Sequence, residues 1–390
     1  MANITKRGDT YRIKVSCGYS VDGKQITKST TYKPDPTKSE KWNEKELQRQ
    51  AVLFEDSCKR GISTTAAKFE NFAREWFANY AELKLKRLTL CSYRRMEKRT
   101  YAALGHIRID KISPLDIQRF VRSLVAEGLS TNTVKNYVRF VSVILNYAVR
   151  KHLLTFNPCV TVDYPTAQET ERDFYTVEEV KRLLALLWQE REEHTEGSYN
   201  DKKPFAMFFT LAAYTGARKG ELLGLEWQDL DFDNNTLSIN RAYYYSSVER
   251  THYTDTPKTK TSRRTLKLPA HVMGMLKEYR TWQTQQKEIC GGSWVDTDRV
   301  FIKWNGESMA TTAPAYFLDT FTKRNNIRRC TVHSFRHFNA SALINEGVDV
   351  VTVQAALGHS TAATTLSIYS HAFSNAQSKA MEAISNAIAI

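Results

Sequence analysis

The heptapeptide TVHSFRH, residues 331–337, sets His333, Arg336 and His337 close together in a stretch predicted to be helical. Side chains three and four residues apart on a helix share a face. Histidine exchanges protons near neutral pH, and arginine pairs with carboxylate or phosphate. We therefore expect the three side chains to converge on a group outside the helix.

A second arginine, Arg218, follows a break at Thr215-Gly216 in AAYTGARKGELLGL. We expect it to begin the next helix, where the positive end of the helix dipole also attracts anions. In TPKTKTSRRTLKLP, Lys258 and Lys260 precede a predicted strand, and a lysine on such a tip can donate a proton. The alternative for all three is an ordinary solvated cation.

The last reactive groups lie in ALGHSTAATTLSIYSHAF, where His359 follows a predicted turn at Gly358 and Tyr369 comes later. A tyrosine hydroxyl has an ordinary pKa of about 10, so as a nucleophile it needs a base and a cationic pocket.

The same residue types allow two other assignments, a different nucleophile and a metal site. Tyr243, Tyr244 and Tyr245 are rival nucleophiles, but their alternating context predicts packing in a sheet. His333, His337 and His359 form an alternative metal site, although no HExxH motif or carboxylate-rich spacing supports it.

The predicted elements explain how these groups would be held. Thr331 is a candidate N-cap, and Gly347 a candidate stop, for the helix that carries Arg336. Thr176 opens another helix through a capping box with Glu179. NTLSINRAYYYSS and RRTLKLP are strand-like. Residues 173–390 are therefore predicted to form a separate, mainly helical domain with a small antiparallel sheet.

Residues 65–160 have a helical pattern throughout. TVKNYVRFVSVILNYAVRK places its apolar residues on one stripe, with Ser130 or Thr131 as the cap. Upstream, KLKRLTLCSYRRMEKRTY interleaves aromatic and basic residues, which suits a helix lying along a phosphate backbone. A solvated charged face is the alternative for its basic residues, which are Lys84, Lys86, Arg87, Arg94, Arg95, Lys98 and Arg99.

Residues 1–60 begin with two alternating, β-branched stretches around a VDG turn, which predict a small basic sheet. Arg12, Lys14 and Lys28 are its candidate DNA contacts. A proline-containing break and a polar helix follow, and we expect this helix to join the sheet to the next domain.

Composition limits the class of protein. The chain has 390 residues, enough for two or three domains, and a net charge of +14 with 42% hydrophobic residues. Nucleic acid is the usual partner of so basic a surface. No run predicts a membrane span, and six scattered cysteines indicate neither disulfides nor a zinc site. We expect a soluble, unsecreted protein of a reducing cytoplasm.

Taken together, Arg218 in TGARKGELLGL, the HxxR form HSFRH, the LGHS turn and the tyrosine beyond it resemble the tyrosine recombinase (phage integrase) family, in both order and spacing. The resemblance implies a multidomain α+β fold: an N-terminal arm-binding module, a helical, SAM-like core-binding domain and a C-terminal catalytic domain. It implies Arg218 and Arg336 as a phosphate clamp, His359 as a further phosphate ligand and His333 as the base. Tyr369 would be the nucleophile. Lys258 would be the acid, with Lys260 as its rival; His337 has no catalytic counterpart.

The resemblance also implies a function. A 3′-phosphotyrosine intermediate stores the energy of the broken bond, so neither cofactor nor metal is expected. The implied partners are double-stranded DNA at core and arm sites, other subunits in a tetramer, an excisionase and a host DNA-bending protein. The expected outcome is integration and excision of a mobile element, in the bacterial cytoplasm and associated with the nucleoid. A type IB topoisomerase-like or dimer-resolving enzyme, and an inactive DNA-binding regulator, remain alternatives.

Overall fold

The computed structural model describes residues 2–19, 25–59, 67–166, 175–189, 202–256, 263–358 and 388. The chain divides into two compact units, Met1–Glu169 and Thr170–Ile390. The described part of the first unit contains two separate hydrophobic cores.

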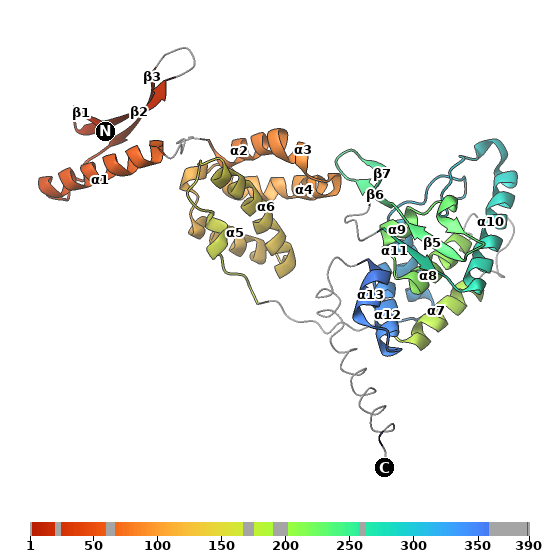
Figure 1. Ribbon diagram of the computed structural model, residues 1–390. Coiled ribbons are helices and arrows are strands. Elements are labelled where there is room, and N and C mark those ends of the chain that lie inside the picture. Colours follow the sequence, from red (N-terminus) through yellow and green to blue (C-terminus); the bar gives the residue numbers. More distant parts are fainter. Residues whose placement is uncertain are drawn as a thin grey trace. The chain divides into compact units, whose positions relative to one another are not determined.

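An antiparallel sheet and a helix form the N-terminal module (Figure 1). Its elements are β1 (Asn3–Arg7), β2 (Thr10–Tyr19), β3 (Gln25–Tyr32) and α1 (Glu40–Lys59). Ile13 and Val15 of β2 pack against Leu47, Ala51 and Phe54 of α1. The expectation that this helix serves as a connector is therefore incomplete, because its apolar face completes the core of the module.

Residues 67–166 are helical around a core of their own. The elements are α2 (Phe69–Trp76), a π-helix (Phe77–Ala81), α3 (Glu82–Lys84), α4 (Arg87–Leu104), α5 (Pro114–Ala126) and α6 (Thr131–Arg150), with short 3₁₀ turns at Ile109–Lys111 and Pro158–Thr161. The predicted stripe of α6 is buried, and Phe140 is buried beside it. Ser130 is the N-cap, since its side chain accepts a hydrogen bond from the Thr133 N–H at 3.3 Å.

The second unit is mainly helical with small antiparallel sheets. Its helices are α7 (Val177–Gln189), α8 (Lys203–Thr215), α9 (Lys219–Leu223), α10 (Ala270–Cys290), α11 (Ala313–Arg324), α12 (Val332–Asn345) and α13 (Val350–Leu357), with 3₁₀ turns at Trp227–Asp229 and Gly291–Ser293. Its strands are β4 (Leu230–Asp231), β5 (Thr236–Ile239), β6 (Ala242–Ser246), β7 (Thr251–Asp255) and β8 (Arg264–Lys267). Helix α8 is the central element, because Met207, Phe208, Phe209 and Leu211 are all inaccessible to solvent.

The strand-like stretch NTLSINRAYYYSS is not one strand. Among the described strands, it divides into β5, which pairs with β4 and β8, and β6, which pairs with β7. Between them, the side chains of Asn240 and Arg241 both donate to the carboxylate of Asp229. These bonds fix the chain where it leaves one sheet for the other.

None of the described helices combines the length and apolar character that a bilayer crossing requires.

Candidate active site

Arg336 lies on the buried side of α12 and is only 2% exposed. Thr331 caps this helix as expected, in a capping box with Ser334. The guanidinium donates from Nη1 to the Gly216 carbonyl oxygen at 2.9 Å and from Nη2 to the Leu357 carbonyl oxygen at 2.8 Å. Arg336 therefore ties α12 to the carboxyl-terminal ends of α8 and α13.

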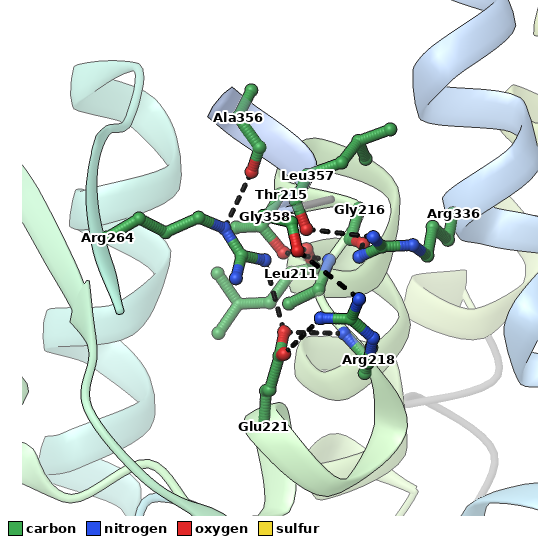
Figure 2. Close-up of polar contacts among 11 residues, drawn as sticks. Leu211, Thr215, Gly216, Arg218, Glu221, Arg264, Arg336, Ala356, Leu357 and Gly358 are labelled. Atoms are coloured by element: carbon green, nitrogen blue, oxygen red, sulfur yellow. Dashed lines mark hydrogen bonds and ion pairs between the residues drawn. The ribbon is translucent and has the colours of Figure 1, made fainter. Parts of the chain in front are cut away.

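Arg218 is the N-cap of α9, as its position after the Thr215-Gly216 break predicts. Its Nη1 donates to Glu221 Oε1 at 2.7 Å, and its Nη2 donates to the Gly358 carbonyl oxygen at 3.3 Å (Figure 2). The side chain remains 42% exposed. Arg218 can thus present its charge to a ligand while these two hydrogen bonds hold its guanidinium in place.

Glu221 and Arg264 belong to the same cluster, and the sequence analysis assigned neither. Both side chains are buried, at 3% and 7% exposure, and Arg264 Nη2 lies 3.1 Å from Glu221 Oε2. Burial by itself raises the pKa of Glu221, but the charge of Arg264, the hydrogen bond from the Arg218 N–H and the charge of Arg218 hold it below its ordinary value. Glu221 is therefore an ionised carboxylate between two guanidinium groups.

The three arginines meet at the end of α13. Arg264 Nε donates to the Ala356 carbonyl oxygen at 2.6 Å, while Arg336 and Arg218 donate to those of Leu357 and Gly358 (Figure 2). The last carbonyls of a helix have no partner within it and carry the negative end of its dipole. Guanidinium groups from three other elements supply the missing donors here.

His333 and His337 form a contact of their own on α12, with ring centroids 4.6 Å apart at an interplanar angle of 84°. His333 is exposed, whereas Arg336 is buried. The guanidinium of Arg336 does reach groups outside the helix, the backbone carbonyls of Gly216 and Leu357. Convergence of all three side chains on one group stays a prediction.

Lys258, Lys260, His359 and Tyr369 lie outside the described residues. Gly358, which directly precedes His359, accepts a hydrogen bond from Arg218. Arg264 begins the strand that follows the two lysines in the sequence.

The rival tyrosines pack within the β6–β7 ribbon, as their alternating context predicts. Tyr243 stacks on His252 with ring centroids 5.2 Å apart, and Tyr244 lies against Tyr253 at 5.7 Å.

The basic residues around α4 divide into two groups. Arg94 is half-buried, pairs with Glu82 at 2.6 Å and Glu97 at 3.0 Å, and covers the Phe77 ring. Arg99 pairs with Glu127 at 2.8 Å. Arg94 and Arg99 therefore form ion pairs inside their own domain. Arg87 is also half-buried. The other exposed members are Lys84, Lys86, Arg95 and Lys98.

The strand register of the N-terminal sheet places its candidate DNA contacts on two different faces. Residues that pair across strands point to the same face, and neighbours along a strand alternate. Arg12 and Lys14 alternate with Ile13 and Val15, so they lie on the face away from α1. Lys28 pairs with Val15 and therefore lies on the α1 side.

Comparison with known proteins gives matches over both units. Two family models match the sequence. The model for the phage integrase family matches residues 174–376, and the model for the phage integrase central domain matches residues 69–164. A tyrosine recombinase XerC-like protein of Caldanaerobacter subterraneus subsp. tengcongensis is 29% identical, covering 98% of each chain. The ICEBs1 integrase of Bacillus subtilis is 27% identical, covering 69% of each chain.

Solved structures share the fold. The Tn1549 transposon integrase, in a complex with a circular intermediate DNA, superposes with a TM-score of 0.66 at 20% identity, covering 82% of this chain and 99% of that one. A lambda integrase tetramer bound to a Holliday junction gives a TM-score of 0.53 at 17% identity, covering 93% and 94%.

Proposed function

The chain belongs to the phage integrase family and is a tyrosine-type site-specific DNA recombinase, and from this premise we propose a role for each residue of its site. Arg218 and Arg336 neutralise the scissile phosphate. The observation that carries this proposal is their joint attachment to consecutive carbonyls, Gly358 and Leu357, immediately before His359 in the sequence.

The proposed reaction is an in-line displacement at phosphorus. The hydroxyl oxygen of Tyr369 bonds to phosphorus while the bond to the 5′ oxygen breaks. His333, which is exposed on α12, takes the tyrosine proton, and Lys258 gives a proton to the departing 5′ oxygen. Arg218, Arg336 and His359 stabilise the charge on the non-bridging oxygens. The product is a 3′-phosphotyrosine, and attack by another strand's 5′ hydroxyl reverses the step.

Preorganisation supports the role of the arginines. Arg336 is held by two carbonyls, and Arg218 is held by a carboxylate and a carbonyl while 42% of its side chain stays open. Charges fixed before the reaction cost no reorganisation when negative charge develops.

The DNA-binding surfaces are proposed on similar grounds. The described strand residues on the open face of the N-terminal sheet are basic or neutral hydrogen-bonding residues, namely Asn3, Thr5, Arg7, Thr10, Arg12, Lys14, Ser16, Thr27, Ser29 and Thr31. Such a face can contact phosphates and base edges together. We assign it to arm sites, and the exposed residues Lys84, Lys86, Arg95 and Lys98 to core sites.

The biological role proposed is integration and excision of a mobile element in bacteria, as a tetramer on DNA, helped by an excisionase and a host DNA-bending protein. The relatives named ICEBs1 integrase and Tn1549 transposon integrase support a conjugative type of element. Dimer resolution is the second candidate, favoured by the XerC-like relative that matches 98% of this chain.

The test is covalent trapping on a nicked duplex that spans the junction of the circularised element. Wild-type protein should form an adduct that survives denaturation. Tyr369→Phe should bind the same duplex and trap nothing. An adduct that persists in this variant would refute the assignment of the nucleophile. Trapping on a chromosomal dimer-resolution site, and not on the element junction, would support the second candidate.

A further inference from the structure

Arg264 lies outside the proposed set of site residues, at the first position of β8. Its backbone is fixed in the sheet, where it pairs with Ile239 of β5. Its side chain leaves the sheet and is 7% exposed. Nε donates to the Ala356 carbonyl oxygen at 2.6 Å, and Nη2 donates to Glu221 Oε2 at 3.1 Å. One guanidinium therefore joins three elements, β8, α9 and α13.

Arg264 shares its carboxylate with Arg218. Glu221 Oε1 accepts from Arg218 Nη1 at 2.7 Å, and Oε2 accepts from the Arg218 backbone N–H at 3.0 Å as well as from Arg264. A carboxylate held through both oxygens has a fixed plane, and that plane sets the direction of the opposite guanidinium. The orientation of the half-exposed Arg218 therefore depends on the buried Arg264.

The second contact of Arg264 concerns the position of α13. Its acceptor, Ala356, is followed by Leu357 and Gly358, which accept from Arg336 and Arg218 (Figure 2). The contact therefore fixes the helix end to which both proposed clamp arginines are bound.

We propose that Arg264 is a positioning residue for strand cleavage, which holds Glu221 and the end of α13 so that Arg218 and Arg336 are aimed at one phosphate. The inference rests on the proposed function. Charge alone does not suffice for this role, because the side chain must donate in two directions at once. Lysine carries the charge but lacks the planar fork.

The experiment compares Arg264→Lys and Arg264→Gln with Arg263→Gln in the full-length protein. Arg263 is the exposed neighbour of Arg264, so its substitution removes an equal charge without touching the cluster. Two nicked duplexes of the proposed site serve as substrates. One carries an ordinary scissile phosphodiester, and the other carries a methylphosphonate there, which removes one negative charge. The rate of adduct formation is measured for each protein with each duplex.

On the phosphodiester, both Arg264 variants should be slowed about a hundredfold, the scale of a misplacement of about 1 Å, while Arg263→Gln should match the wild type. On the methylphosphonate, the Arg264 variants should recover to within a few-fold of the wild type, because less charge must be neutralised. The ratio of the two rates in one preparation does not depend on the fraction of protein that is folded. Partial misfolding therefore cannot produce this result.

Three results would overturn the inference: an Arg264→Lys rate equal to wild type on the phosphodiester, an equal loss on both substrates, or no adduct on either. Failure of the wild type to form any adduct with the phosphodiester would instead remove the proposed function.

Discussion

Arg336 and Gly216 are joined by a buried hydrogen bond of 2.9 Å, from the guanidinium of α12 to the residue that ends α8. Gly216 has a φ of 57°, in the left-handed region where glycine pays no steric cost. This conformation turns the chain sharply between α8 and α9. Asn339, also on α12, donates to the carbonyls of Ala213 and Tyr214 beside it. Helix α12 thus caps α8 with the same face that holds Arg336.

Gly216→Ala should destabilise the second unit and slow adduct formation. A Cβ at this position would lie 2.6 Å from Leu357 Cδ2 and 2.8 Å from Asn339 Oδ1. The left-handed conformation alone costs a non-glycine residue about 1–2 kcal/mol, and the close contacts add to this. Urea unfolding measures the loss of stability, and single-turnover trapping measures the rate.

Gly274→Ala provides the control for this substitution. Gly274 lies inside α10 with open space around its Cβ position, so alanine there should stabilise the helix by about 0.5–1 kcal/mol. Equal effects of the two substitutions would show that the turn at Gly216 has no special requirement.

Glu221→Gln should lower the free energy of unfolding at pH 7 by about 3–5 kcal/mol, because it leaves a buried guanidinium without its counter-ion. Since the pKa of Glu221 is lowered by folding, the ionised carboxylate stabilises the protein above its unfolded pKa of 4.5. That contribution is lost as the pH falls through the folded value.

The difference in stability between wild type and Glu221→Gln should therefore shrink between pH 7 and pH 3, as followed by urea unfolding. Asp233→Asn, in an exposed turn, removes a charge from the same unit and serves as the control. A difference that stayed constant with pH would contradict an ionised Glu221.

Lys14→Ala should weaken binding of the full-length protein to arm-site DNA, and it should lower the dependence of log K on log salt by about one unit. Lys28→Ala is the matched control, because it removes the same charge from the α1 side of the same sheet. Fluorescence anisotropy at several salt concentrations measures both. Equal losses for the two lysines would indicate a general charge effect and not a binding face.

Leu47→Ala should unfold the N-terminal module selectively. Leu47 is 6% exposed in the small core between α1 and the sheet, and loss of a buried leucine side chain costs about 2–5 kcal/mol. Limited proteolysis should cut this variant first within residues 2–59, while trapping on a core site alone continues. Resistance equal to that of wild type would mean that α1 is not needed by the module.

The sequence predicted what depends on local pattern. The caps of α12 and α7, the buried stripe of α6 and the position of Arg218 at the start of α9 all follow from spacing over a few residues, and the structure confirms them.

The arginine cluster could not be predicted in this way. Arg264 meets Glu221 across 43 residues of sequence and Ala356 across 92. Its acceptor at Ala356 is a backbone carbonyl. Because every residue has one, the residue type at this position does not indicate the contact. For Glu221 a signal existed, because it stands three residues after Arg218 and fills the N3 position of a capping box.

The β6–β7 ribbon interrupts the chain between β5 and β8, yet β5 and β8 pair directly with each other. The β5–β8 pairing that positions Arg264 therefore forms without a contribution from the ribbon. During divergence or laboratory evolution, a change in length or sequence at residues 247–250, between β6 and β7, should therefore leave the β5–β8 pairing at Arg264 in place.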